Sequence, residues 1–206
     1  MLLKRTHLHQ GDLPEGLDLG PVVAIDSETM GLSPWRDRLC LVQLSKGDGI
    51  CHLVQFGRTA GPAPRLAALL ADTRKLKLLH FARFDLAMFK HHLGVLTRPV
   101  YCTKTASRLA RTMTDKHGLK DLCKELLGID LSKQQQTSDW GAEVLSEEQK
   151  VYAATDVLHL HELKQKLDAL LVREGRIEFA RACFDFIPYR AALDLAGWGE
   201  DDIFAH

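Results

Sequence analysis

The sequence lacks several features that mark specialised classes of protein. Its 206 residues contain no internal repeat, no low-complexity tract and no hydrophobic run long enough to span a membrane. An excess of positive or negative charge is also missing, because 27 Lys and Arg balance 27 Asp and Glu. No overall basic field is therefore available to bind long nucleic acid through many phosphates. These absences argue against a membrane association and predict a cytoplasmic protein.

Cysteine is present, but not in a pattern typical of disulfides or zinc sites. The five cysteines are odd in number, and none is spaced as Cys-x-x-Cys. We expect reduced thiols that serve as small core hydrophobes. With 46% hydrophobic residues, the chain is long enough for one sizeable core, which predicts a single domain over residues 1–206.

Short apolar runs predict strands in the first half of the chain. They cover residues 22–25, 39–44, 51–56 and 76–81, after a loop or short edge strand near residues 2–8. A Lys-Gly-Asp-Gly turn at residues 46–49 joins the second and third runs, so we expect an antiparallel hairpin or meander with the first run.

Helical spacing follows in the second half. The expected helices cover residues 64–71, 84–94, 103–111, 119–127, 146–172 and 176–186. Ser146, with Gln149 three residues later, has the pattern of a capping box, and Gly128 suits the end of the helix before it. Strands followed by helices predict an α/β fold, in which a mixed sheet is flanked by helices on both sides.

Two carboxylates follow the first predicted strand. Asp26 and Glu28 are two positions apart, so both side chains point to the same side of an extended backbone. Two like charges there need a cation, and Mg²⁺ is the ordinary partner of carboxylate oxygens. By itself the pair is weak evidence, and a strand that ends in a polar turn is the favoured interpretation.

Two further acids lie on later elements. Asp85 follows the predicted strand 76–81, at a strand-to-helix junction of the kind that often carries functional groups. Asp156 lies in the long helix, four residues after Tyr152, so the two share one helical face. Its neighbours are apolar, and a buried carboxylate must be paired or bound to a metal. A salt bridge for Asp156 and a core position for Tyr152 are the alternatives.

Together, the four acids and the tyrosine resemble the three motifs of the DEDDy branch of the DnaQ-like 3′-to-5′ exonucleases. The likeness to ribonuclease D is carried by residues 80–85, 138–140 and 152–156, although the sequence has no room for the C-terminal helical domains of full-length ribonuclease D. A narrower likeness is to nanoRNase C, the short dinucleotide-degrading enzymes of alphaproteobacteria. It is carried by residues 81–85, 101–104, 131–136 and 202–206.

The resemblance implies a ribonuclease H-like fold with a mixed five-stranded sheet flanked by helices. It also implies two divalent metal ions, Mg²⁺ or Mn²⁺, about 3.5 to 4 Å apart. Asp26 would bridge both ions, Glu28 and Asp156 would complete the first, and Asp85 would hold the second largely through water. Tyr152, with an ordinary pKa of about 10, is a poor base and is expected to orient the attacking water. Hydrolysis would release a nucleoside 5′-monophosphate from the 3′ end.

Several other residues are candidates for substrate binding. Leu32 aligns with the leucine that wedges between two bases in related oligoribonucleases, and packing on the core is its alternative. His80 and Arg83 border Asp85, where they would contact phosphate or cap a helix. The candidates also include Met30 and Gly31 beside the wedge, and Lys133, Gln135, Gln136 and Ser138 in a polar loop that either donates to phosphates or is simply solvated.

Two positions depart from the pattern of the family. Phe81 stands where ribonuclease D has asparagine, which removes one possible polar contact to the substrate. Ser27 replaces the common threonine between the two acids. We expect this second change to be harmless, because the side chain points away from the metals.

Three functions are compatible with these residues. The first is a metal-dependent exoribonuclease acting on RNA dinucleotides, which the neutral charge and the missing accessory domains favour. The second is a general 3′-to-5′ exonuclease acting on structured RNA, as in tRNA trimming, or on DNA. The third is a non-catalytic binding module, which the complete set of acids argues against.

Assembly is the last expectation. The apolar side chains Trp198, Ile203 and Phe204 near the C-terminus either fold back on the core or meet another subunit. The resemblance to nanoRNase C implies a ring-like homo-octamer, with residues 187–206 in subunit contacts.

Overall fold

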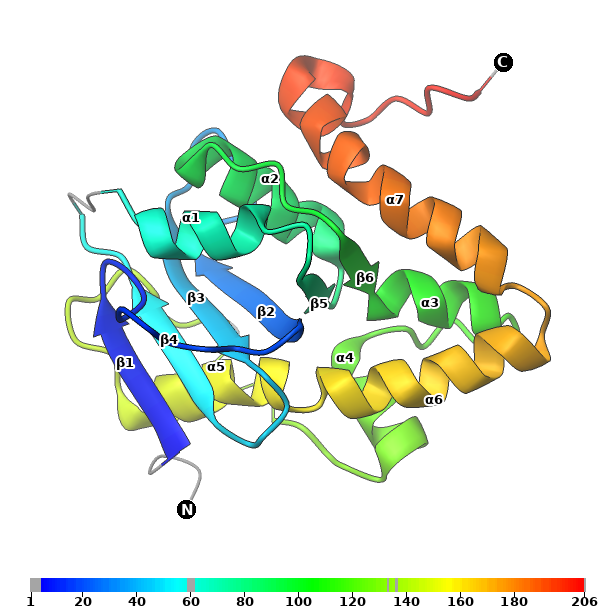
Figure 1. The fold of residues 1–206 in the computed structure, drawn as a ribbon, viewed down its shortest axis with the longest axis horizontal. Coiled ribbons are helices and arrows are strands. Elements are labelled where there is room, and N and C mark those ends of the chain that lie inside the picture. The colour runs from blue at the N-terminus through cyan, green and yellow to red at the C-terminus, as the bar shows by residue number, and fades with distance from the viewer. Residues whose placement is uncertain (1–4, 59–61, 133, 136, 206) are drawn as a thin grey trace.

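A six-stranded mixed sheet forms the centre of the protein (Figure 1). The computed structural model describes residues 5–58, 62–132, 134–135 and 137–205. The strands are β1 (Thr6–Gln10), β2 (Val22–Thr29), β3 (Leu39–Ser45), β4 (Cys51–Gln55), β5 (Leu76–Leu79) and β6 (Val100–Cys102), in the spatial order β1-β4-β3-β2-β5-β6. Strand β3 is antiparallel to β2 and β4, and the other pairs are parallel.

The sheet confirms the expected α/β fold and the meander of β2, β3 and β4. It has one strand more than the five that we expected. Strand β6 has only three residues, so no alternating pattern could reveal it. The edge strand β1 starts at Thr6 and pairs with β4.

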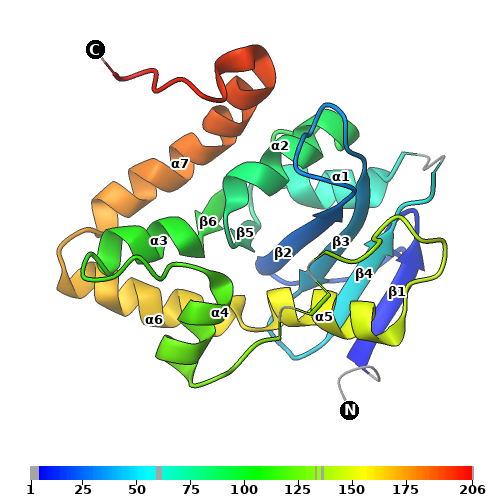
Figure 2. The same cartoon turned by 180° about the vertical axis from the view of Figure 1, so that it is seen from behind.

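Helices cover both faces of the sheet (Figures 1 and 2). They are α1 (Pro64–Ala71), α2 (Ala82–Leu93), α3 (Thr103–Ala110), α4 (Leu119–Leu122), α5 (Glu147–Leu158), α6 (Leu160–Arg173) and α7 (Ile177–Leu193), with the π-helical turns η2 (Cys123–Leu127) and η3 (Asp194–Trp198). Helix α5 packs against β2, β3 and β4, while α1 and α2 lie on the opposite face. Helix α7 packs against α2 and α3.

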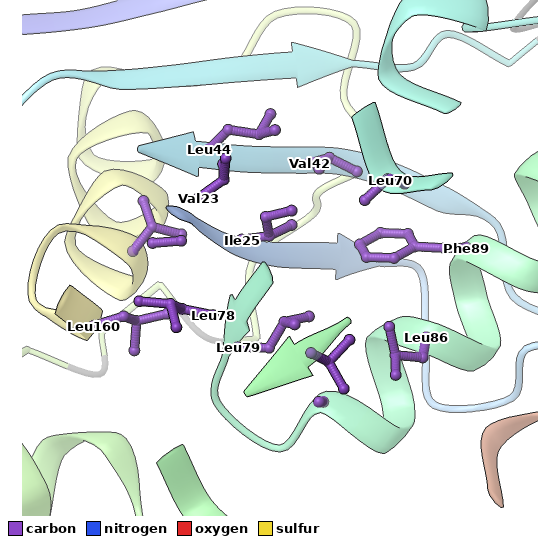
Figure 3. Close-up of a cluster of buried hydrophobic side chains, with 14 of the residues drawn as sticks. Val23, Ile25, Val42, Leu44, Leu70, Leu78, Leu79, Leu86, Phe89 and Leu160 are labelled. Atoms are coloured by element: carbon purple, nitrogen blue, oxygen red, sulfur yellow. The ribbon is translucent and has the colours of Figure 1, made fainter. Parts of the chain in front are cut away.

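The side chains of β2 alternate between these two faces. Ile25 is fully buried and belongs to the apolar cluster that also contains Leu70 of α1 and Phe89 of α2 (Figure 3). Because successive residues of a strand point to opposite faces, Asp26 and Glu28 must point the other way, toward α5. The packing of the core thus fixes the side of the sheet on which the two acids appear.

Three of the expected helices differ clearly from the structure. The helix expected over residues 119–127 is α4 followed by the π-helical turn η2. The long helix expected from Ser146 to Val172 is interrupted at His159, where φ is −104° and ψ is −4°. The interruption lets α5 cover the sheet while α6 packs against α3. The last helix continues past Phe186 through Pro188 to Leu193. Pro188 is buried, and its packing outweighs the one backbone hydrogen bond that a proline removes from a helix.

The expected capping box at the start of α5 is confirmed. The Ser146 hydroxyl accepts a hydrogen bond from the Gln149 N–H at 3.2 Å, and the Gln149 side-chain oxygen accepts one from the Ser146 N–H at 2.9 Å. The Gln149 amide also donates to the Ser138 hydroxyl at 3.1 Å, which ties the preceding loop to the helix. Helix α5 therefore starts at a fixed point, and so do the side chains that it carries.

The cysteines and the apolar character of the helices were the other features considered from composition. The five cysteines are free, and four of them are buried, as expected of small core residues. Within the described ranges, no helix combines the length and the apolar character needed to cross a membrane.

Candidate active site

Three carboxylates from two elements converge on the α5 face of the sheet. Asp26 and Glu28 of β2 and Asp156 of α5 each place one ligand oxygen within 4.8 Å of the others. The charges that act on Asp156 come from another acid, Asp85, and in the described part of the chain it forms no salt bridge to a cation. The salt-bridge alternative for Asp156 is therefore wrong, and the cluster is one that a cation would stabilise.

Asp85 approaches the cluster from the other face. It lies on the first turn of α2, is 3% exposed, and accepts a hydrogen bond of 2.5 Å from the Ser27 hydroxyl. Ser27 alternates to the α2 face of β2, so it points away from Asp26 and Glu28 and toward Asp85. The structure agrees with the expected orientation of this side chain, and the harmlessness of serine in place of threonine stays a prediction, because both carry a hydroxyl. The sequence did not reveal that this hydroxyl holds the fourth acid.

Burial raises the pKa of all four carboxyls. It raises the pKa of Glu28 to about 9, of Asp85 to about 7 and of Asp156 to about 7, and it raises the pKa of Asp26 well above its usual range. Neighbouring carboxylates add to the effect of burial at Asp26, Glu28 and Asp156. Without a cation, the cluster therefore retains protons near neutral pH, and a divalent ion would compete with them.

Gln43 completes this side of the cluster, although the sequence pattern did not single it out. It pairs with Asp26 in the β2–β3 register and is fully buried. Its amide nitrogen lies 3.5 Å from the Asp26 Oδ2 and 3.5 Å from the Glu28 Oε1. The available signal was a polar residue inside the otherwise apolar run of β3, opposite the two acids.

Tyr152 faces the same carboxylates, one helical turn before Asp156. Burial, together with the charges of Asp156, Glu28 and Asp26, raises the pKa of the phenol above its usual range. The hydroxyl is therefore protonated at neutral pH and is a donor, as expected of a group that orients water. A pocket of about 290 Å³ opens beside the ring. Its lining includes Ser132, Gln134, Gln135, Glu148 and Thr155.

Leu32 projects from a tight turn at the end of β2. It is 84% exposed, so the alternative in which it packs on the core is wrong. The turn folds around Asp37, whose carboxylate accepts a hydrogen bond from the Ser33 N–H at 2.9 Å. A Cβ atom at Gly31 would overlap that carboxylate, so the turn requires glycine there. Met30, which is 49% exposed, lies beside the glycine.

His80 and Arg83 both have hydrogen-bond partners within the chain. The His80 Nδ1 lies 2.9 Å from the Thr103 hydroxyl, and burial lowers the pKa of His80 to about 3, so the ring is neutral. Arg83 donates two hydrogen bonds to the Asp194 carboxylate, of 2.6 and 2.7 Å. Arg83 thus connects α2 to η3, and the structure favours this positioning role over the expected phosphate contact or helix cap.

The polar loop before α5 is only partly described. The Gln135 carbonyl accepts a hydrogen bond from the Ser138 N–H at 3.1 Å, and Gln135 lines the pocket beside Tyr152. Lys133 and Gln136, also expected to bind phosphate, lie outside the described residues.

The chain matches a known family over more than three quarters of its length. The family described as 3′-5′ exonuclease matches residues 11–171. The chain belongs to the 3′-5′ exonuclease family. Within this exonuclease family, ribonuclease D of Gluconacetobacter diazotrophicus is 36% identical over 165 residues, which cover 80% of this chain and 42% of that protein. The chain therefore spans about two fifths of the length of the ribonuclease D relatives that it matches.

Solved structures share the fold along 98% of the chain. NrnC of Brucella melitensis is 53% identical, with a TM-score of 0.95 over 98% of this chain and 99% of that one. The same protein bound to pGG gives 52% identity and a TM-score of 0.94, over 98% of each chain. With bound Mg²⁺ it gives 51% and 0.93, again over 98% of each. The resemblance predicted from the motifs is confirmed, and so is the exonuclease fold.

The stability of the metal-free protein is expected to fall as pH rises. The folded pKa values of Glu28, Asp85 and Asp156 lie above those of unfolded carboxyls, which are about 4, so the folded state retains protons that the unfolded state releases. The free energy of unfolding therefore decreases from about pH 5 toward pH 9. Scanning fluorimetry in EDTA should show a falling Tm over this range, and Mg²⁺ should raise Tm more at pH 8 than at pH 6.

Matched variants identify the origin of this pH dependence. Glu28→Gln and Asp156→Asn each remove a carboxyl whose pKa is raised, so they should make Tm fall less steeply with pH. Glu143→Gln, at an exposed acid, should leave the pH dependence of Tm unchanged. A Tm that rises with pH in the metal-free protein would contradict the conclusion that Asp26, Glu28 and Asp156 are buried together and repel one another.

Proposed function

We propose that this chain is a divalent-metal-dependent 3′-to-5′ exoribonuclease that hydrolyses RNA dinucleotides and very short oligoribonucleotides to nucleoside 5′-monophosphates. The observation that carries the proposal is the convergence of Asp26, Glu28 and Asp156, with Asp85 held beside them by Ser27. The likeness to Brucella melitensis NrnC, solved with pGG and with Mg²⁺, supports it. Action in the cytoplasm, by a single exonuclease domain over residues 1–206, is part of the proposal.

The donor atoms fit hard divalent cations. All four acids offer oxygen, the donor that Mg²⁺ and Mn²⁺ prefer, and the three of the cluster are close enough to share an ion. Asp26, Glu28 and Asp156 would hold the ions as direct ligands, and Asp85, which Ser27 holds beside them, would add the fourth carboxylate. When bound, two such ions supply a nucleophile at neutral pH and stabilise the charge on the attacking and leaving oxygens.

The other residues position the reactants. Tyr152 keeps its proton at neutral pH, and the raised pKa of the phenol strengthens this, so its hydroxyl can donate a hydrogen bond that orients the attacking water. Ser27 holds the Asp85 carboxylate in place through its hydroxyl. The exposed Leu32 inserts between the two bases of the substrate, an apolar contact that does not depend on base identity.

A second candidate function uses the same chemistry on longer substrates. It is a general 3′-to-5′ exonuclease acting on structured RNA, as in tRNA trimming, or on DNA, and the likeness to a ribonuclease D described as involved in structured RNA processing supports its RNA form. The balanced net charge favours the short substrate, because a dinucleotide presents few phosphates to neutralise.

Substrate length separates the two candidates. With Mg²⁺, the purified protein should cleave a labelled RNA dinucleotide faster than a seven-nucleotide RNA, a tRNA precursor or a DNA dinucleotide, and EDTA should stop the reaction. Asp85→Asn should abolish cleavage, because it removes a charged ligand from a desolvated site. Equal or faster cleavage of the longer substrates would favour the second candidate, and undiminished activity in Asp85→Asn would refute the site.

The hydrogen bond from Ser27 offers a test at a residue that binds no metal. Ser27→Ala leaves Asp85 without its side-chain donor and should lower activity roughly 10- to 100-fold, the usual cost of losing a partner that orients a metal ligand. Ser27→Thr retains the hydroxyl and should remain close to the unmodified protein. Equal rates for the alanine and threonine variants, both folded by circular dichroism, would show that the hydrogen bond has no role in catalysis.

We also propose that the chain assembles as a homo-octamer, with residues 187–206 in subunit contacts. Trp198 is 50% exposed and Phe204 is 80% exposed, so this segment presents apolar side chains to its surroundings.

Light scattering on a sizing column should give a mass near eight times the 23.1 kDa of the chain. Phe204→Ser should shift the protein toward smaller species, because it removes apolar contact area. Met113→Ser, at another exposed apolar residue that is 97% exposed, is the matched control and should not. A monomeric unmodified protein would contradict the octamer.

A further inference from the structure

Phe81 adopts a backbone conformation that its side chain disfavours. Its φ of 62° and ψ of 43° are left-handed, and it is the one non-glycine residue with positive φ in the part of the chain that the structure describes. A Cβ atom makes this region unfavourable, and glycine or asparagine usually occupies it. Burial does not compensate, because Phe81 remains 49% exposed. Strain of this kind tends to persist where it serves a function.

Lys104, whose ammonium lies over the Phe81 ring, is also in an electrostatically unfavourable position. It is on the first turn of α3, where the helix dipole disfavours a cation, and that turn contains no acidic residue. Among the described residues it forms no salt bridge. Its ammonium lies 4.1 Å from the centroid of the Phe81 ring, a cation–π contact that holds the ring from one side.

A buried hydrogen-bond chain fixes both residues to the end of the sheet. The Thr103 hydroxyl, next to Lys104, donates to the Leu79 carbonyl at 3.2 Å and lies 2.9 Å from the Nδ1 of His80, next to Phe81. Helices α2 and α3 therefore start from one connected point, after the adjacent parallel strands β5 and β6 (Figure 1). Phe81 is the N-cap of α2 and Asp85 lies on its first turn, so the exposed ring and the fourth acid belong to the same end of this helix.

We propose that Phe81, held by Lys104, is a stacking platform for one nucleobase of the substrate. Every base has a π face, so an exposed aromatic ring binds any unpaired base, while a base inside a duplex cannot reach it. The inference rests on the proposed function and deepens it. It makes Phe81, at the position where ribonuclease D has asparagine, the residue that gives a preference for unpaired RNA ends. Lys104 is a positioning residue that orients the ring.

Substitutions that suit the backbone separate recognition from folding. Phe81→Gly and Phe81→Asn fit a positive φ, so Tm should be unchanged or higher. The KM for an RNA dinucleotide should nevertheless rise roughly 5- to 150-fold, with a smaller change in kcat, because base stacking is lost. Phe81→Tyr should retain the unmodified KM. An unchanged KM in both the glycine and asparagine variants would overturn the proposal, and so would a lowered Tm with KM intact.

Removing the base instead of the ring tests the contact from the other side. Two dinucleotides, each abasic at one position, are compared with the intact one by calorimetric binding in EDTA. For the unmodified protein, one of the two abasic substrates should bind more weakly than the intact dinucleotide. For Phe81→Gly, that abasic substrate and the intact dinucleotide should bind alike. Penalties that are the same in both proteins would show that the ring contacts no base.

The role of Lys104 is tested by charge. Lys104→Met should raise KM with little effect on Tm, and Lys104→Arg should restore KM, because a guanidinium also binds an aromatic face. Failure of arginine to restore it would exclude the cation–π clamp. If the unmodified protein hydrolyses no RNA, the proposed function fails, whereas hydrolysis with a KM insensitive to Phe81 and to base removal refutes the platform alone.

Discussion

Carboxylates repel one another, and this chain gathers four of them around β2, an inner strand of its sheet. In the described part of the chain, no salt bridge to Lys, Arg or His offsets the charges of Asp26, Glu28 and Asp156. Burial increases the repulsion, which is why the pKa of Glu28 is raised to about 9. The fold must supply the energy that holds such a cluster together. It does so with the apolar packing beneath β2 and with the fixed start of α5, and a bound cation would relieve the repulsion that remains.

The two-residue period of a strand organises the site as well as the core. Ile25 packs under α1 and α2, and the next residue, Asp26, appears on the α5 face. Ser27 returns to the first face and bonds Asp85, which belongs to a helix on that side. Three consecutive side chains therefore serve the core, the cluster and the support of the fourth acid. A shift of one residue in the register of β2 would exchange all three roles at once.

Features of the fold and the site that depend on local sequence pattern could be predicted from the sequence. Alternation and apolar runs predicted the β2, β3 and β4 meander, and spacing on a helix placed Tyr152 and Asp156 on one face. The contributions of Gln43 and Ser27 depend on which strand and helix lie opposite, and a linear pattern does not contain that information. Strand β6 was too short to show a period. The partner of Arg83 lies 111 positions away, beyond any local rule.

Arg83 also joins two parts of the chain that are otherwise remote. It bonds Asp194 and the carbonyl of Gly199, and it stands two residues before Asp85 on the same turn of α2. Three hydrogen bonds therefore join the C-terminal turn η3 and Gly199 to the turn of α2 that carries Asp85. Free-energy coupling between two positions is reciprocal. If a contact made by the C-terminal segment changes the affinity of the acidic site for an ion, then binding of that ion must change the affinity of the contact by the same factor.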